Sequence, residues 1–277
     1  MKKTSIGKPF VASPYVVWSV IFIIVPLIMV AYYSFTDANG NFTLSNLAAL
    51  SNYKEIFLIS VLYAVVATVI TLLISYPLAY FMTKTKLSTQ GTLMMLVMLP
   101  MWMNFLIRTY SWISILANTG IINTFLSKLG IGPLQLINTP GAVILGMIYN
   151  YMPYMILPIY SAMSKLDNSL LEAAGDLGSN AFSKLRRVII PLSMPGVISG
   201  ITMVFVPSVS TFYISQKLGG GKNMLIGDVI EMQFQSSYNY NLGAALSLVL
   251  MVLILICMAI MNRFSGDEEE SGGGLMP

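Results

Sequence analysis

The two side chains most often used for metal ligation and thiol chemistry, histidine and cysteine, are almost absent from this sequence. The 277 residues include no histidine and a single cysteine, Cys257, which lies inside an apolar run. Histidine ligation, cysteine–histidine catalysis and disulfide frameworks are therefore excluded. No chemistry of that kind is available to this chain, and we expect it to hold no metal or cofactor of its own.

The acidic residues with the most informative spacing lie in Glu172-Ala173-Ala174-Gly175-Asp176-Leu177-Gly178, a polar interruption between two long apolar runs. Apolar residues recur at spacings of three and four, which predicts one helix face; they are Leu166, Leu170, Ala173, Ala174 and Leu177. Glu172 and Asp176 fall one turn apart on another face.

A second short helix is expected after Gly178. This glycine can end the first helix in a left-handed conformation, and Ser179 or Asn180 can cap the next, before Pro191 returns the chain to the membrane. Helices this short are marginal in water, so the pair should need a partner. A helix lying in the lipid headgroup layer is the alternative interpretation.

The composition requires a membrane to surround these elements. Hydrophobic residues make up 56% of the chain and charged residues only 9%, with a mean hydropathy of +0.76, whereas about a quarter of the residues in soluble domains are charged. The net charge of +4 arises from basic residues flanking the apolar runs, which favours a lipid surface over nucleic acid.

Six runs have the roughly 20 apolar residues that a spanning helix needs: 14–35, 58–82, 91–117, 140–164, 192–214 and 241–263. They are too uniformly apolar for barrel strands. The first is too long for a cleavable signal and is interpreted as an uncleaved span. We expect an all-α bundle of six membrane-spanning helices, a single domain over 14–263, after a short terminus at 1–13.

The basic residues predict the orientation of these spans. Ten lie on one side, Lys2, Lys3, Lys8, Lys84, Lys86, Lys165, Lys184, Arg186, Arg187 and Arg263, and four on the other, Lys54, Lys128, Lys217 and Lys222. The positive-inside rule places both termini and the Glu172 loop in the cytoplasm. The acidic, glycine-rich tail at 264–277 is expected to be disordered.

The polar loop also resembles a known signature. Glu-Ala-Ala, three residues, glycine, nine residues and then Val188-x-Ile190-Pro191 is similar to the EAA motif of ABC importer permeases, whose fold would be type I-like. The resemblance implies a coupling helix that docks on a cytoplasmic ATPase, with a pairing role for Glu172 and a turn at Gly178. Ala173, Ala174 and Pro191 complete the motif.

The ATPase itself is expected to be a separate subunit that binds ATP and Mg²⁺. Gly219-Gly220-Gly221-Lys222-Asn223 superficially resembles a phosphate-binding loop, but Gln216 and Asn223 replace the glycine and the hydroxyl residue that a Walker A motif requires. We interpret this segment as a turn.

Further matches are similar to the permeases of spermidine/putrescine importers in bacterial inner membranes. They are Leu99-Pro100, Trp102, Ile107 to Tyr110, Met163 to Asp167, Leu218 to Gly220, Leu225 to Gly227, Gln233-Phe234 and Gly243 to Ala245. The resemblance implies a second related permease, an ATPase dimer and an external polyamine-binding protein as partners. A permease for sulfate, molybdate or ferric ion remains an alternative, because all of these share the loop.

Candidates for the substrate path are aromatic, hydroxyl and acidic side chains, since a polycation is stabilised by π faces and oxygens. They are Trp102, Asn104, Tyr154, Ser208, Thr211, Tyr213, Asp228 and Glu231. The predicted spans contain no Asp or Glu, which argues against an ion-coupled secondary transporter. Near Pro207, helix packing with hydroxyls bonded to their own helix is an equal interpretation of Ser208 and Thr211.

Arg108 is the only charge within a predicted span. Intramembrane charges are usually functional, but a cation on a polycation's path would repel the substrate. A structural pairing of Arg108 with backbone carbonyls or a helix end is the favoured expectation.

Overall fold

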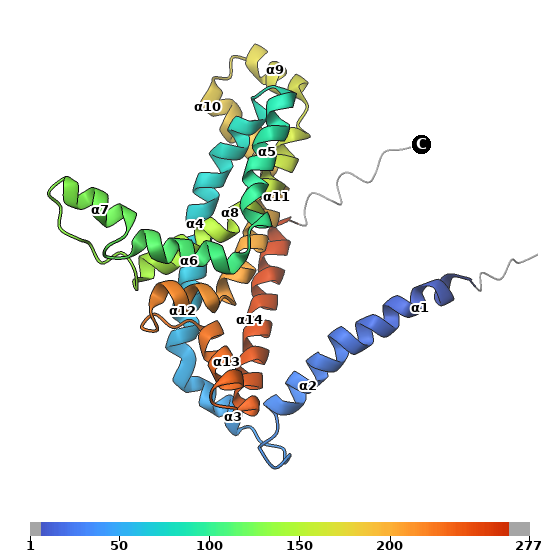
Figure 1. Ribbon diagram of the computed structural model, residues 1–277. Helices are drawn as coiled ribbons and strands as arrows, with labels where there is room; N and C mark the ends of the chain where they lie inside the picture. Colours follow the sequence, from blue (N-terminus) through green and yellow to red (C-terminus); the bar gives the residue numbers. More distant parts are fainter. Residues whose placement is uncertain (1–6, 266–277) are drawn as a thin grey trace, which may run out of the picture. The chain divides into compact units, whose positions relative to one another are not determined.

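The structure is a computed structural model that describes residues 7–265. These residues form helices joined by loops, with one isolated antiparallel bridge between Thr36 and Phe42. The α-helices (Figure 1) are α1 Gly7–Ser19, α2 Val25–Ser34, α3 Ser45–Ala49, α4 Lys54–Thr83, α5 Leu87–Trp102, α6 Phe105–Leu116, α7 Ile121–Lys128, α8 Pro140–Ser164, α9 Asn168–Asp176, α10 Ala181–Lys184, α11 Ile190–Val209, α12 Tyr213–Gly219, α13 Ile226–Gln235 and α14 Tyr240–Ser265. Short π or 3₁₀ turns cover Val20–Ile24, Leu50–Tyr53 and Leu185–Ile189.

Five helical segments of the described chain are long and apolar enough to cross a membrane: Ser13–Ser34, Ser45–Thr83, Pro140–Ser164, Ala181–Val209 and Tyr240–Met261. A sixth is obtained if the bent pair Leu87–Trp102 and Phe105–Lys128 counts as one span. The all-helical class is confirmed. Helix α1 starts before the predicted terminus at 1–13 ends, and the predicted tail lies outside the described residues from 266 onward.

The third run is not the single straight span that the sequence predicted. Helices α5 and α6 meet at an angle of 91°, and Met103 between them has an extended backbone. The side chain of Asn104 caps α6 by accepting hydrogen bonds from the backbone N–H groups of Leu106 (2.8 Å) and Ile107 (3.4 Å). This cap stabilises a new helix start inside an apolar run.

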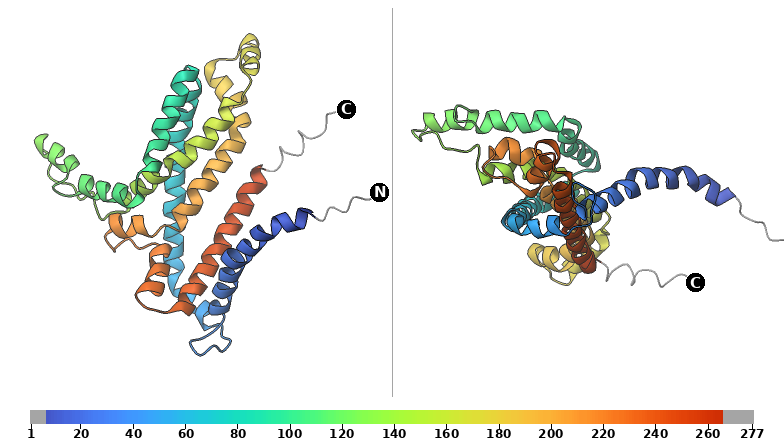
Figure 2. Two further views of the ribbon diagram at one scale, coloured as in Figure 1. Left: turned by 45° about the vertical axis from the view of Figure 1, so that its right-hand side comes forward. Right: turned by 90° about the horizontal axis from the view of Figure 1, so that it is seen from below.

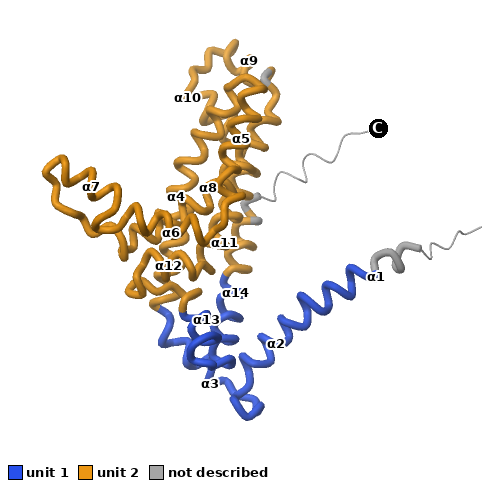
Figure 3. The backbone as a smooth tube through the Cα atoms, in the orientation of Figure 1, with its two compact units in different colours: residues 1–54, 229–253 blue, residues 55–228, 254–277 orange. Residues whose placement is uncertain are grey.

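The chain divides into two compact units, residues 1–54 with 229–253 and residues 55–228 with 254–277 (Figure 3). In the first unit, the Nδ2 of Asn241 donates hydrogen bonds to the carbonyls of Thr36 (2.7 Å) and Tyr33 (3.1 Å). These bonds tie the start of α14 to the turn that follows α2. The proposed boundaries of the permease domain stay a prediction.

The second unit is built around α8, which packs along α11 and also contacts α5, α6 and α12 (Figure 2). Small residues of α4 are fully buried against this core, including Ala67 and Ala79. Gly196 and Gly200 allow α11 to approach α8, because a Cβ at either position would meet Pro158 or Met155 within 2.7 Å. The packing of α8 against α11, α6 and α12 positions the Glu172 loop and the region where α6 meets α12.

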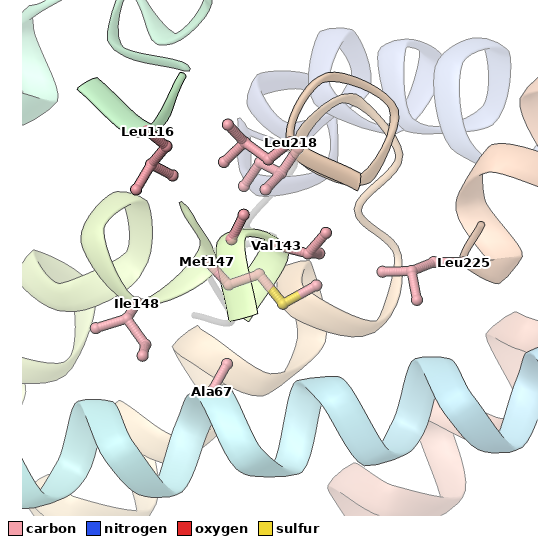
Figure 4. Close-up of a cluster of buried hydrophobic side chains, with 9 residues drawn as sticks. Ala67, Leu116, Val143, Met147, Ile148, Leu218 and Leu225 are labelled. Atoms are coloured by element: carbon pink, nitrogen blue, oxygen red, sulfur yellow. The ribbon is translucent and has the colours of Figure 1, made fainter. Parts of the chain in front are cut away.

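One apolar cluster joins α4, α6, α8 and α12 (Figure 4). Val143 and Met147 of α8 are fully buried beside Leu218 of α12 and Leu116 of α6. A second cluster includes Met155, Ile159, Met163 and Ile189. The first cluster supports the α6–α12 region, and the second supports the polar loop.

Candidate functional site

The first candidate site is the Glu172 loop, residues 165–191, which lies at one end of α8 and α11 (Figure 1). Its first helix, α9, is capped by Asp167, whose Oδ1 accepts a hydrogen bond of 2.9 Å from the backbone N–H of Ser169. This bond to the charged form lowers the pKa of the Asp167 carboxyl from its usual value. Sequence reasoning missed this cap.

Gly178 ends α9 in the predicted left-handed conformation, with φ of +78°. Its N–H donates to the carbonyl of Gly175 (2.8 Å), and the N–H of Ser179 donates to the carbonyl of Ala174 (3.0 Å). A Cβ at Gly178 would have nothing within 4 Å. Glycine is therefore favoured here by the backbone angle and not by a lack of space.

The predicted second short helix, α10, is the N-terminal part of the candidate membrane span Ala181–Val209. Asn180, and not Ser179, caps α10 by accepting a 2.8 Å hydrogen bond from the N–H of Ser183. The helix continues through a π turn at Leu185–Ile189 into α11. Pro191 lies just after this π turn, at whose end the N–H of Ile190 donates to the carbonyl of Leu185. The helix therefore departs from regular α geometry next to the residue that lacks an N–H.

The apolar residues of the loop divide between two directions. Leu166, Leu171 and Leu185 pack against the buried cluster around Met163 and Ile189. Other apolar side chains face outward: Leu170 is 49%, Leu177 87% and Phe182 70% exposed. The sequence predicted that the apolar residues in and around α9 share one helix face, and this prediction is wrong in part. Leu171, which is not on the predicted face, packs α9 against the buried cluster, whereas Leu170 and Leu177 of the predicted face are exposed.

Glu172, Ala173, Asp176 and Pro191 are exposed, and Ala174 is half-buried. Neither Glu172 nor Asp176 makes a hydrogen bond or ion pair with the described residues. The loop therefore presents both an exposed carboxylate, Glu172, without a partner in the described chain, and exposed apolar side chains. A second protein with a basic or hydrogen-bonding group next to an apolar cleft could bind this combination.

A polar bridge holds the neighbouring α4–α5 turn in place. The hydroxyl of Tyr160 donates a 2.8 Å hydrogen bond to Oε1 of Gln90, and Nε2 of Gln90 donates to the carbonyls of Thr85 (2.9 Å) and Thr83 (3.3 Å). A cleft of about 510 Å³ between this turn and α9 is also lined by Lys84 and Lys86. These hydrogen bonds hold the α4–α5 turn against α8, next to the Glu172 loop.

The second candidate site is the α6–α12 aromatic cluster, defined as Phe105, Tyr110 and Tyr213. The ring centroid of Tyr213 lies 5.7 Å from that of Phe105 and 6.5 Å from that of Tyr110. The Nζ of Lys217 lies 5.8 Å from the Tyr110 centroid and 5.7 Å from the Tyr213 centroid. Of these residues, only Tyr213 was among the predicted path candidates.

Arg108 contacts the same cluster, with its guanidinium carbon 5.9 Å from the Phe105 centroid. Its side chain is only 8% exposed, and Nε and Nη1 have no hydrogen-bond partner in the described part of the chain. The expected pairing with carbonyls or a helix end is therefore wrong for this structure. An aromatic face stabilises the charge instead.

Two other path candidates flank the α5–α6 bend: Trp102 is 69% exposed and Asn104 is the cap of α6. Tyr154 on α8 is 39% exposed. Ser208 is buried, and its Oγ donates to the carbonyl of Val204 at 2.6 Å. For Ser208 the helix-packing interpretation holds. Thr211 is buried in the short break between α11 and α12.

The two acidic candidates differ in their surroundings. Asp228 is 2% exposed; its Oδ1 accepts a hydrogen bond from Oγ of Ser215 (2.9 Å) and its Oδ2 one from the N–H of Leu225 (2.6 Å). In this structure its carboxylate therefore positions the start of α13 and faces no open surface. Glu231, farther along α13, is half-buried and belongs to the other unit.

The glycine-rich segment between α12 and α13 is a turn, as predicted. Gly220 and Gly221 have φ of +61° and +72°, and the N–H of Lys222 donates to the carbonyl of Gly219 at 3.3 Å. A Cβ at Gly220 would also lie within 2.3 Å of Asn138. Backbone angle and packing both account for glycine at this position.

Comparison with known proteins agrees with this arrangement. Residues 9–266 match the family described as "Binding-protein-dependent transport system inner membrane component". The chain is 43% identical over 232 residues to the Haemophilus influenzae "Spermidine/putrescine transport system permease protein PotB", which covers 80% of this chain and 81% of that protein. The Escherichia coli K12 protein of the same name is 40% identical over 227 residues, covering 78% and 82%.

The fold is also similar to solved structures. A chain of the bacterial alginate ABC transporter in complex with its alginate pentasaccharide-bound periplasmic protein matches with a TM-score of 0.76 at 16% identity, covering 92% of each chain. This likeness shows a shared fold, and the matches in sequence show the family. The chain thus belongs to the family of binding-protein-dependent transport system inner membrane components and is similar within it to the PotB permease proteins.

Proposed function

We propose that this chain is the permease subunit of an ATP-driven importer of polyamines such as spermidine and putrescine. The observation that carries the proposal is the 43% identity over 80% of the chain to a permease with that function in its name. The α6–α12 aromatic cluster supports it, because the rings of Tyr110 and Tyr213 contact the ammonium of Lys217, which is the same group that a polyamine carries.

The proposed importer contains four further components: a second homologous permease, two ATP-binding subunits that hold ATP and Mg²⁺, and an extracytoplasmic polyamine-binding protein. The two permeases would each form half of the translocation path across a bacterial inner membrane. Both termini and the Glu172 loop would face the cytoplasm, in agreement with the ten basic residues on that side.

We assign coupling to the Glu172 loop. Glu172 has no partner within the described chain, and Leu177 and Phe182 of the same loop expose apolar side chains. Docking on an ATPase would bury these side chains and pair the carboxylate. Ala173 and Ala174 would allow close approach, while Gly178 and Pro191 would set the directions of the two helices.

For the substrate path we retain the predicted candidates. Trp102, Tyr154 and Tyr213 offer ring faces, and Thr211 and Glu231 offer oxygens. The side chains of Asn104 and Ser208 are used within α6 and α11. Asp228 acts at this site by holding α12 and α13 together, since its carboxylate is buried and hydrogen-bonded. Direct contact with substrate would therefore come mainly from the aromatic residues.

The proposal is tested by uptake of labelled spermidine in cells that carry or lack this chain. Uptake should depend on the chain, and excess unlabelled putrescine or spermidine should compete, whereas sulfate, molybdate and ferric ion should not. Competition by one of these ions, together with normal spermidine uptake in the deletion strain, would assign the permease to a different solute.

A further inference from the structure

The contact between Lys217 and two tyrosine rings suggests a cation site that the chain fills with its own side chain. We propose that Tyr110 and Tyr213 form a binding site for a primary alkylammonium group, and that the Lys217 ammonium occupies this site until a ligand displaces it. The identity of the natural ligand as a polyamine rests on the proposed function; the existence of the site does not.

The geometry is that of a cation in contact with two rings, which are themselves nearly perpendicular to each other with an interplanar angle of 79°. The Nζ of Lys217 lies 5.8 Å and 5.7 Å from the two ring centroids, within the roughly 6 Å range of cation–π contacts. Tyr213 and Lys217 are one turn apart on α12, and Tyr110 comes from α6. The Phe105 ring lies behind Tyr213, at 5.7 Å between centroids.

Within the described residues 7–265, the ammonium of Lys217 contacts the two tyrosine rings. Lys217 makes no hydrogen bond or ion pair with the residues that the structure describes, although it is half-buried. Tyr110 is 51% exposed, so this chain itself leaves one side of the ring uncovered. A ligand could therefore reach the rings once the lysine side chain moves away.

The chemistry of the occupant defines the ligand class. A lysine side chain is an ammonium on four methylenes, which is also one end of 1,4-diaminobutane. A site that accommodates Lys217 therefore accommodates an aminobutyl group. Because the lysine is tethered, its effective concentration at the rings is in the millimolar range or above. Weak ligands would be excluded, and a ligand delivered at high local concentration would compete.

Arg108 provides a contrast within the same cluster. Its guanidinium faces Phe105 and is 8% exposed, so it is held in place by the surrounding protein. Lys217 is on a more exposed surface and has a flexible stem. The geometry therefore makes Lys217 the displaceable cation and Arg108 a fixed one.

The direct test measures binding of n-butylammonium by saturation-transfer NMR. The full complex, with its partner permease and ATPase subunits but without the binding protein, is placed in nanodiscs. Lys217→Ala empties the site and should give a signal roughly fivefold or more above wild type at millimolar ligand. Lys217→Met fills the site with a neutral chain and should stay at the wild-type level.

Lys222→Ala is the matched control, because it removes an exposed positive charge from the same region without emptying the site. It should behave as wild type. Adding Tyr213→Ala to Lys217→Ala should abolish the signal, and n-butanol should give none with any variant. Equal signals from Lys217→Ala and Lys222→Ala, or a signal that survives loss of Tyr213, would overturn the proposal.

A second measurement uses the wild-type complex and does not depend on a variant that folds. n-Butyltrimethylammonium does not react with amine-labelling reagents. Once its concentration exceeds the effective concentration of the tethered lysine, it should displace Lys217 and raise the labelling rate of Lys217 several-fold without changing that of Lys222. An unchanged Lys217 rate would contradict self-occupancy. If both measurements succeed while the complex takes up no polyamine, the site stands and the proposed substrate is wrong.

Discussion

The hydroxyl of Ser215 donates a 2.9 Å hydrogen bond to the Oδ1 of Asp228, and both side chains are 2% exposed. The same carboxylate accepts from the N–H of Leu225, and the next N–H, that of Ile226, donates to Oγ of Ser60 on α4 at 2.8 Å. These bonds fix α12 and the start of α13 beside α4. Tyr213 of the aromatic cluster lies on the same helix as Ser215, so these bonds also help to position its ring.

Loss of the Ser215 hydroxyl should therefore destabilise the protein. Ser215→Ala leaves a buried carboxylate oxygen with one donor fewer, which typically costs about 1–3 kcal/mol. Thermal unfolding of the purified complex should show a lower midpoint. Ser210→Ala is the control, since Ser210 is exposed and bonds to its own helix. Equal unfolding midpoints for Ser215→Ala and Ser210→Ala would contradict the structural role proposed for Asp228.

Glu172→Gln should weaken coupling without affecting the stability of the permease. The carboxylate is exposed and unpaired within the described chain, so its charge is available only to a partner. Co-purification of the ATPase and polyamine-stimulated ATP hydrolysis should both fall. Asp176→Asn neutralises an equally exposed acid one turn away and should retain both. If the two variants behave alike, general surface charge and not the motif position explains the effect.

Gly178→Val should reduce uptake through backbone strain. A left-handed angle costs an L-residue roughly 1–2 kcal/mol, and a β-branched side chain makes it worse. Gly130 provides a matched control, because it has φ of +77° and also has nothing within 4 Å of a built Cβ. Gly130→Val should suffer similar strain yet keep ATPase coupling. If Gly130→Val uncouples ATP hydrolysis from uptake as strongly as Gly178→Val, the effect comes from impaired folding and not from the position of Gly178 in the loop.

The Asp167 cap predicts a dependence on pH. Hydrogen bonding to Ser169 lowers the carboxyl pKa in the folded loop, so the ionised form stabilises α9 at neutral pH. This stabilisation is present above the unfolded pKa and is lost as the pH falls below about 4. Hydrogen exchange in α9 should accelerate with Asp167→Ala at pH 7, but far less with Asp167→Asn, which can still cap. Identical exchange in both variants and the wild type would rule out the cap.

Much of the fold follows from the sequence because its signals are local. The fourth predicted span, 140–164, agrees with α8 at Pro140–Ser164. Thr139 caps it, Pro140 suits the first turn, and Lys165 marks the water boundary. The left-handed end at Gly178 was predictable for the same reason: a single residue type specifies the conformation.

The break between α5 and α6 was not predictable from hydropathy. Trp102, Met103 and Phe105 keep the run apolar through the bend, and an amide such as Asn104 can equally well be buried inside a straight helix. Only the cap that Asn104 forms shows that a new helix begins there. Local composition therefore cannot distinguish a straight helix through Asn104 from a new helix that starts at Asn104.

The aromatic cluster depends on contacts between distant parts of the chain. Tyr110 and Tyr213 are about a hundred positions apart, and their proximity follows from the packing of both α6 and α12 on α8. Arg108 was expected to need carbonyl partners because its aromatic surroundings cannot be read from spacing. The burial of Asp228 likewise depends on Ser215, from another helix.

The central claim is that this permease moves polyamines by ATP-driven coupling through the Glu172 loop. It is tested most directly in proteoliposomes containing the complete complex, with the binding protein outside and ATP and Mg²⁺ inside, by measuring accumulation of labelled spermidine. The account predicts accumulation that requires ATP, persists when ionophores collapse the ion gradients, and is lost in Glu172→Gln. Accumulation without ATP that disappears with the ion gradient would contradict it.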